Sequence, residues 1–270
     1  MDQLVLAIEC DPSVDTVCTP EFVNELFETQ VVFSLGGFDV NRAMLLMFLA
    51  AFISIALLYF GFRKARVVPT KFGTAMEGLV GFVRDEIAMG IIGPTGARYF
   101  PYLLSVFLFV LIGNLFEVTP FINFPITSRM AIPAFLAIVT WLIFVINGFA
   151  THGLTYLKES LFPPGVPKFL YVLVTPIELV STFLVRPFSL AVRLFANLVA
   201  GHVMLSLLLV SSYVYITSVG DIGARAVIGV GWSVLGMGIY LFEILVSFLQ
   251  AYIFTLLSAV YIESSTNIEH

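Results

Sequence analysis

Long, almost uninterrupted apolar stretches constrain the fold of this chain more than any other feature of its sequence. A helix needs about 20 consecutive apolar residues to cross the hydrocarbon core of a bilayer, and stretches of this kind recur between residues 43 and 262. Only 11% of the 270 residues are charged, whereas a soluble domain carries about 25%. The sequence therefore predicts an all-α integral membrane protein.

Five apolar segments are predicted to cross the membrane. They cover residues 43–62, 99–118, 131–150, 175–215 and 226–262. The last two are too long for a simple crossing, because such helices measure about 55–60 Å and the hydrocarbon core is only about 30 Å thick. We therefore expect them to form an antiparallel hairpin of steeply tilted helices. Neither an internal repeat nor a low-complexity linker is evident, so a single membrane domain is predicted over residues 1–270.

The first of the two long helices has a recognisable start and a proline inside it. Thr175 is a favoured N-cap residue, Pro176 suits the first helical position, and Glu178 completes a capping box. A helix beginning at Thr175 is therefore predicted. Pro187 is expected to kink it, because proline cannot donate a backbone hydrogen bond.

Charge placement predicts the orientation of the chain. Residues 1–40 contain eight acidic residues and no Lys or Arg, whereas Arg63 begins a basic cluster directly after the first span. The positive-inside rule places that cluster in the cytoplasm, with residues 1–42 as an acidic outer segment and the C-terminus inside. Apolar residues then recur every three or four positions over 72–92, with charged residues between them. This pattern predicts an amphipathic helix on the inner membrane surface.

Both cysteines, Cys10 and Cys18, lie in the acidic segment. If this segment faces an oxidising compartment, they can form a disulfide that closes a small loop. Two free thiols are equally compatible with the sequence.

An arginine inside the fourth apolar segment requires a partner. Arg193 keeps its charge inside a protein, and a charge at bilayer depth costs at least about 2.5–3.5 kcal/mol. One possibility is an internal pair with Glu178, Glu117 or Glu243 that fixes helix packing. The alternative is a neighbouring chain, which is favoured by a stripe of polar and small residues spaced three or four apart. The stripe comprises Arg186, Ser189, Arg193, Asn197 and Gly201.

Small residues in such a stripe let another membrane helix approach closely. The stripe therefore presents Arg193 to a neighbour. Arg186 is nearer the cytoplasmic end of its segment, where a long basic side chain can also extend toward the membrane interface.

Polar residues with acid–base capacity also occur at bilayer depth. Glu243, Ser247 and Gln250 share one helix face by their spacing, and Asn114 and Glu117 share another. His202 lies about half a turn out of phase with Arg193. Acid and imidazole groups can take up and release protons near neutral pH when their surroundings shift their pKa values. Series of such groups mark proton routes in membranes. The alternative is a satisfied hydrogen-bonded cluster between helices.

The sequence contains no motif that indicates another kind of chemistry. The sequence contains no Cys/His cluster with metal-ligand spacing and no glycine-rich phosphate loop after a strand. It has no nucleophile turn of a hydrolase, and its basic residues are too few and scattered to bind nucleic acid. We therefore expect no metal, cofactor or bound nucleotide. Two alternatives remain at this point: a secondary transporter that uses Arg193 to hold an anionic substrate, although these commonly show paired repeats, and a structural subunit of a respiratory complex.

Two segments of the sequence resemble those of a known family. The first is Arg193-Leu-Phe-Ala-Asn197-Leu-Val-Ala-Gly201-His202, and the second is Phe242-Glu243-Ile-Leu-Val-Ser-Phe-Leu-Gln250-Ala-Tyr-Ile-Phe. Both closely resemble subunit a of the F-type rotary ATP synthase membrane sector, Fo. The resemblance covers most of the chain and excludes the acidic N-terminal segment.

The resemblance implies a function and roles for individual residues. Arg193 matches the arginine that faces a ring of c-type proteolipid subunits, each carrying one carboxylate, and bars leakage between two offset half-channels. Asn197 and Gln250 match a family asparagine and glutamine. His202 and Glu243 stand where well-known bacterial relatives have an acid and a histidine, so the pair is exchanged. The implied proton path comprises Glu243, His202, Gln250, Asn197, Ser247, Asn114 and Glu117.

The resemblance also implies partners and a location. The expected protein is a non-catalytic stator subunit that couples proton flow to ring rotation and ATP synthesis. Its partners would be the c-type ring, the b subunits of the peripheral stalk, the rest of the ATP synthase and the lipid bilayer. Arg186 occupies a position that is lysine in some relatives and would act as an auxiliary charge. A bacterial plasma membrane is expected, with an organelle inner membrane as the alternative, and protons are the expected ion.

Overall fold

A computed structural model describes most of the chain after residue 30. The described residues are 31–35, 38–63, 70–119, 122, 124, 126–153, 155–162, 168–217 and 224–266. Cys10, Cys18 and most of the acidic segment lie outside them. The chain divides into two compact units: unit 1 comprises Met1–Met47, Gly113–Ser128 and Ala196–Phe248, and unit 2 comprises Phe48–Ile112, Arg129–Phe195 and Leu249–His270. The single membrane domain over residues 1–270 stays a prediction.

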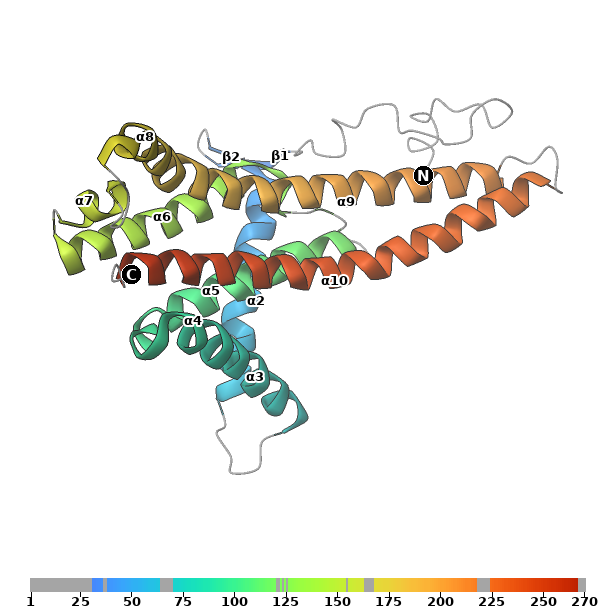
Figure 1. The fold of residues 1–270 in the computed structure, drawn as a ribbon. Helices are drawn as coiled ribbons and strands as arrows, with labels where there is room; N and C mark the ends of the chain where they lie inside the picture. The colour runs from blue at the N-terminus through green and yellow to red at the C-terminus, as the bar shows by residue number, and fades with distance from the viewer. Residues whose placement is uncertain are drawn as a thin grey trace. The chain divides into compact units, whose positions relative to one another are not determined.

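Five described helical segments are long and apolar enough to cross a membrane (Figure 1). They are α2 (Arg42–Phe62), α5 (Phe100–Val118), α6 (Ala131–His152), the continuous segment Tyr171–Thr217 and α10 (Ala224–Thr266). The fourth is made of α8 (Tyr171–Val180), the π-helical turn η6 (Ser181–Val185) and α9 (Arg186–Thr217). The predicted all-α membrane protein with five crossing helices is confirmed.

The last two helical segments form the expected over-long hairpin. Tyr171–Thr217 contains 47 residues and α10 contains 43, so they measure about 65–70 Å, more than twice the hydrocarbon thickness of about 30 Å. Within unit 1 they run antiparallel. The hydroxyl of Ser212 on α9 donates to the carbonyl of Gly229 on α10 at 3.2 Å. Farther toward the start of α9, Leu209 lies against Gly236 of α10.

The fourth segment starts earlier than the sequence predicts. It begins at Tyr171, so Thr175 lies inside α8 and its hydroxyl donates to the carbonyl of Leu161 at 3.2 Å. The predicted capping box at Thr175 is therefore wrong. Leu161 ends α7 (Thr155–Leu161), a short helix that the sequence analysis did not predict. Its contact with Thr175 uses the hydroxyl that would otherwise cap a helix.

The distortion expected at Pro187 takes the form of a π-helical turn. The turn η6 directly precedes α9, and at its end the Arg186 N–H donates to the carbonyl of Ser181, five residues back. Pro187 has no N–H to donate and its ring crowds the preceding turn. A wider turn before the proline relieves this crowding, and such turns often occur at functional sites.

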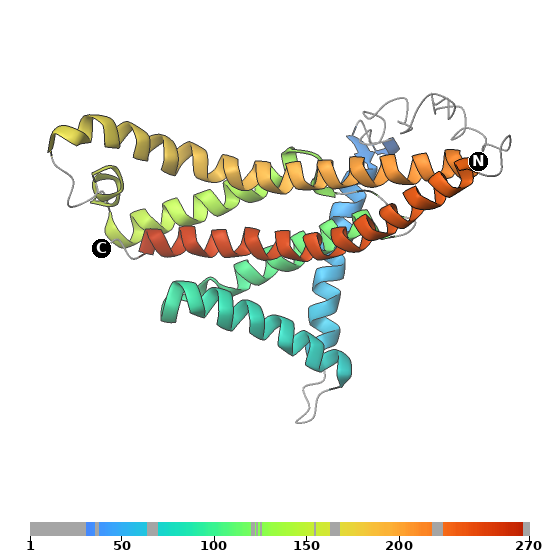
Figure 2. The same ribbon diagram turned by 45° about the vertical axis from the view of Figure 1, so that its right-hand side comes forward.

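The predicted amphipathic helix is present in unit 2 in three parts. They are α3 (Lys71–Gly81), the π-helical η2 (Phe82–Met89) and α4 (Gly90–Ile92), which precede α5 (Figure 2). Its apolar side includes the buried Met76, Val83 and Ile87, whereas its charged residues are exposed. Phe82 contacts the rings of Phe107 on α5 and Tyr252 on α10 at centroid distances of 6.3 and 5.6 Å. Part of the apolar side therefore packs against membrane-spanning helices of the same unit.

A tight turn joins this segment to α5. It passes through the 3-10 turn η3 (Gly93–Arg98), where Gly93 has a φ of 79°. A Cβ at Gly96 would lie 2.0 Å from the carbonyl oxygen of Ala88. Because only glycine lacks this atom, Gly96 permits the close backbone approach that reverses the chain.

A small hairpin precedes the first span in unit 1. Strand β1 (Val31–Leu35) pairs antiparallel with β2 (Phe38–Asn41), with Ser34 opposite Asp39. Gly36 and Gly37 separate the two strands in the sequence, and a Gly-Gly pair between apolar runs is a hairpin signal. The predicted all-α fold does not include this hairpin.

A polar network ties helix ends together in unit 2. The amide oxygen of Asn147 on α6 accepts a hydrogen bond from the hydroxyl of Tyr99. Its amide nitrogen donates to Ser265 Oγ at 3.2 Å and Thr266 Oγ1 at 2.9 Å. The imidazole of His152 adds a hydrogen bond of 3.0 Å to the carbonyl of Thr266. The end of α10 is thereby fixed to α6.

Replacing Asn147 by Leu is expected to lower the thermal stability of the protein. The substitution removes the hydrogen bonds of Asn147 to Tyr99, Ser265 and Thr266, and each such bond contributes about 0.5–1.5 kcal/mol. Thermal denaturation of the detergent-solubilised protein measures the change. The control is Thr151→Val, because Thr151 is exposed and bonds only to the carbonyl of Asn147 in its own helix. Equal melting temperatures for both variants would argue against the network's role.

Candidate functional site

Unit 1 contains a buried cluster of polar side chains from three helices and one turn. Every member is 5% exposed or less. α5 supplies two, the 3-10 turn η4 (Ile126–Ser128) one, α9 one and α10 two. The members are Asn114, Glu117, Thr127, His202, Glu243 and Ser247. Apart from Thr127, all of them belong to the proton path that the sequence predicts.

Asn114 links three parts of this cluster. Its amide oxygen accepts a hydrogen bond from the hydroxyl of Thr127 at 3.2 Å. Its amide nitrogen lies 3.5 Å from the backbone carbonyl of Ser247, at the long limit of a hydrogen bond. α5, η4 and α10 are thus joined through one buried amide. The same region is reinforced by the hydroxyl of Tyr240, which donates to the carbonyl of Val118 at 2.5 Å.

An acid and an imidazole face one another at the centre of the cluster. Nδ1 of His202 lies 3.8 Å from Oε1 of Glu117, and the two side chains are 3% and 0% exposed. Neither carboxylate oxygen of Glu117 has a hydrogen-bond donor among the described residues. Buried polar atoms are nearly always hydrogen-bonded, so the carboxylate of Glu117 retains the capacity to accept a proton or a hydrogen bond. The arrangement can exchange protons.

The carboxylate of Glu243, the second acid of the cluster, lies directly against Gly201 of α9. A Cβ built on Gly201 of α9 would lie 2.6 Å from Oε1 of Glu243 and 2.7 Å from its Oε2. A real Cβ cannot approach a carboxylate so closely, so the missing side chain of Gly201 makes room for Glu243. Gly201, the last residue of the predicted stripe of polar and small residues, is buried.

Arg193 has a different environment in unit 2. Its side chain is exposed, whereas its neighbours Leu190 and Leu194 are both only 1% exposed. No ion pair joins it to a described residue of its own unit, including Glu178. The guanidinium is therefore presented at the surface of unit 2.

Arg186, the other arginine of α9, is held by its own unit. Its guanidinium donates to Ser264 Oγ at 3.2 Å and lies 5.5 Å from the centre of the Tyr261 ring. A guanidinium over an aromatic face gains a cation–π attraction. The two arginines of α9 therefore differ: Arg186 is engaged within unit 2 and Arg193 is exposed.

Five predicted path residues meet in unit 1. The other two, Asn197 and Gln250, make no described side-chain hydrogen bond with them. Asn197 of α9 is half-buried in unit 1, and Gln250 of α10 is half-buried in unit 2. Sequence reasoning missed Thr127, which lies in the connection between α5 and α6. No periodicity marks a residue in such a connection, so only the contact with Asn114 reveals it.

Comparisons with known proteins identify the family of this chain. A family model described as ATP synthase A chain matches residues 44–263. ATP synthase subunit a of Frankia alni is 38% identical over 88% of this chain and 83% of that protein. The subunit of Rhodococcus erythropolis is 37% identical over 93% of both chains, and that of Rhodospirillum rubrum is 36% identical over 88% of this chain and 94% of its own. With five helices able to cross a membrane and relatives of this identity, the chain belongs to the ATP synthase A chain family.

Proposed function

We propose that this chain is the stator subunit of the Fo proton channel of an F-type ATP synthase in a bacterial membrane. The observation that carries the proposal is the exposed Arg193, which has no counter-charge among the described residues of its own unit. A permanent charge at bilayer depth requires a partner. The partner in this proposal is the carboxylate of a c-type ring subunit, which passes Arg193 as the ring turns.

The buried cluster of unit 1 would form the outer half-channel. A proton entering from the outer side would move by way of Asn114, Glu117, His202, Glu243 and Ser247 to a ring carboxylate. The close approach of Glu117 and His202 supports this path, because both side chains can bind a proton and are shielded from lipid. Asn197 and Gln250 would extend the polar path along α9 and α10.

Arg193 would separate this path from a second, inner half-channel. A guanidinium cannot release its proton, so it cannot relay one across the membrane. It favours the ionised form of a nearby carboxylate, so the ring carboxylate would release its proton before passing Arg193. A neutral carboxylate can then return only through the lipid, which makes rotation obligatory. Each charge that crosses yields about 2.3 kcal/mol per 100 mV.

The proposed function also implies an orientation and partners for the subunit. The N-terminus would lie outside and the C-terminus in the cytoplasm, with the b subunits of the peripheral stalk holding the chain against the ring. The subunit would not bind a nucleotide or catalyse ATP synthesis itself. Arg186 would contribute an auxiliary positive charge. A transporter and a respiratory subunit, the two alternatives from the sequence, gain no support from the comparisons, whose relatives named above are ATP synthase subunit a.

Purification tests this assembly. A tagged form of the chain, isolated in mild detergent, is expected to carry with it a ring of very small proteolipids. Isolation of a functional monomer that transports an anion would favour the transporter instead.

Replacing Glu243 by Gln is expected to slow proton transport without abolishing it. Gln keeps the size of the side chain over Gly201 but cannot bind and release a proton, while Glu117 and His202 remain available. ATP-driven acidification of inverted membrane vesicles measures the rate, and the control is Glu77→Gln at an exposed acid of α3. We expect a several-fold decrease for the first variant only. An unchanged rate would remove Glu243 from the path.

A further inference from the structure

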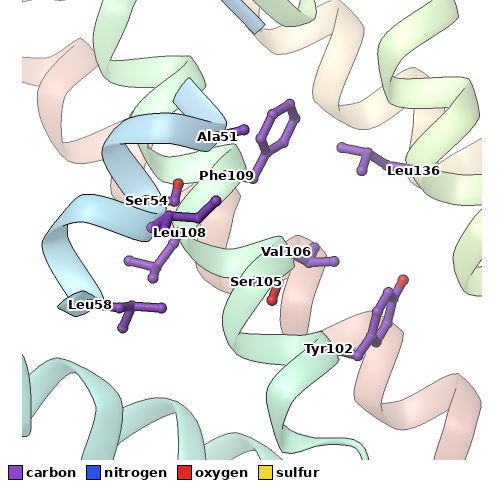
Figure 3. Close-up of a pocket in the computed structure, with 10 residues that line it drawn as sticks. Ala51, Ser54, Leu58, Tyr102, Ser105, Val106, Leu108, Phe109 and Leu136 are labelled. Atoms are coloured by element: carbon purple, nitrogen blue, oxygen red, sulfur yellow. The ribbon is translucent and has the colours of Figure 1, made fainter. Parts of the chain in front are cut away.

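A hollow at the surface of unit 2 has no role in the proposed proton path. It has a volume of about 360 Å³ and lies between α2, α5 and α6 (Figure 3). This volume is within the range of about 300–1,000 Å³ that is usual for pockets that hold small molecules. Its lining includes Ala51, Ser54 and Leu58 of α2, Tyr102 and Ser105 of α5, and Leu136 of α6.

The polar atoms of this lining already have partners within the protein. Ser54 Oγ donates to the carbonyl of Ala50 at 2.8 Å, and Ser105 Oγ donates to that of Pro101 at 2.7 Å. The hydroxyl of Tyr102 pairs with that of Thr140 on α6 at 2.7 Å. With their hydrogens donated within the protein, these three hydroxyls leave no free donor, and the rest of the lining is apolar. The hollow is therefore suited to an apolar occupant.

The dimensions of the hollow favour a lipid chain over a helix. Residues 51–58 and 102–109, which line it, rise only about 10 Å along each helix, a third of the hydrocarbon core of about 30 Å. A membrane-spanning helix would need a groove about three times as long. The side chains of Phe52 and Ile55 on α2, the second of which also lines the hollow, are each 68% exposed. An acyl chain can enter from that side.

A cation stands just beyond the hollow. Arg63 follows the last lining residue of α2, Leu58, by five residues, a rise of about 7.5 Å and a rotation of about 140° around the helix axis. Its side chain is exposed, lies over the ring of Tyr59 at 5.7 Å, and forms no ion pair with a described residue of unit 2. Basic groups at the end of a membrane helix attract anionic lipid headgroups. Because α2 ends at Phe62, the phosphate of a lipid whose chain enters the hollow can reach this guanidinium across the helix end.

We propose that the hollow between α2, α5 and α6 binds an acyl chain of an anionic phospholipid whose phosphate is held by Arg63. The small side chains of Ala51, Ser54 and Ser105 make the space for the chain. The charge of Arg63 selects the headgroup. This site is separate from the proposed proton path and does not depend on it.

Photolabelling of the assembled complex in vesicles tests the proposal. The probe is phosphatidylglycerol with a diazirine in its acyl chain, compared with phosphatidylcholine that carries the same chain. We expect cross-links on residues 51–58 and 102–109, with about a fivefold preference for the anionic probe. Ala51→Leu, which fills the hollow, should remove these cross-links, whereas the matched Ala131→Leu at an exposed site of α6 should leave them unchanged.

The headgroup is tested by a second pair of variants. Arg63→Gln should retain the acyl cross-links and lose the anionic preference, whereas Arg84→Gln, at another exposed arginine of unit 2, should keep it. Three outcomes would overturn the proposal. They are equal labelling of all lipid-facing helices, equal labelling by both probes with Arg63 intact, and protection of the hollow by a helix of another subunit.

Discussion

Replacing Arg193 by Ala is expected to abolish ATP-driven proton pumping. Without the guanidinium, an ionised ring carboxylate at this position is left without its counter-charge, and removing one partner of a buried ion pair costs about 3–5 kcal/mol. This corresponds to a decrease of at least about 100-fold. Quenching of a pH-sensitive dye in inverted membrane vesicles measures the pumping, and ATP hydrolysis is followed in the same vesicles.

Two further variants test whether the loss of pumping is specific to the guanidinium of Arg193. Arg193→Lys keeps the charge but loses the planar group with five donors, so we expect partial activity at most. Arg186→Ala should retain more activity, because Arg186 is engaged by Ser264 and Tyr261 within unit 2. The amount of each variant in the membrane is compared by immunoblot. Normal pumping by Arg193→Ala at normal abundance would refute the proposed role.

Replacing Gly201 by Ala is expected to decrease proton pumping by about tenfold or more, the rate change that corresponds to about 1.4 kcal/mol in an activation barrier. The new Cβ would lie 2.6 Å from Oε1 of Glu243, so the carboxylate must leave its position beside α9. The helix itself should tolerate the change, since alanine favours a helix by about 1 kcal/mol over glycine. The defect should therefore appear in transport rather than in assembly.

A double variant tests whether the contact between residue 201 and Glu243 causes the loss of pumping. Glu243→Asp shortens the acid by one methylene and leaves space for the new methyl group, so the double variant should pump better than Gly201→Ala alone. Such non-additivity is the signature of residues in contact. The control is Gly236→Ala, a buried glycine whose Cβ would meet its nearest atom at an ordinary 3.5 Å. Equal losses from Gly201→Ala and Gly236→Ala would contradict the explanation.

The sequence predicts the membrane helices well because the bilayer imposes a length and a composition. All five crossings were identified, including the over-long pair, since the stretches around Arg193 and Glu243 exceed what one crossing requires. The predicted start of the fourth segment at Thr175 is wrong, because this segment begins at Tyr171. Local capping preferences suggested that position, but the hydroxyl of Thr175 bonds to Leu161 instead. A tertiary contact thus overrides a local signal.

The composition of the buried cluster could be predicted in part. Glu117, His202 and Glu243 stand out because acids and imidazoles are rare in apolar helices. Their mutual arrangement could not be predicted, since it depends on how three helices pack. Gly201 illustrates this limit: in the sequence it resembles any small residue of a helix contact, whereas the structure shows that it accommodates Glu243. The assignment of these residues to a proton path stays a prediction.

The central claim is that the counter-charge of Arg193 belongs to a moving partner. The most direct measurement is a density map of the assembled complex that resolves the surroundings of this guanidinium. The account predicts a carboxylate of a ring subunit within about 4 Å of it, the usual limit of an ion pair. A guanidinium closed in a pair with Glu117, Glu178 or Glu243 of its own chain, turned away from the ring, would contradict the account.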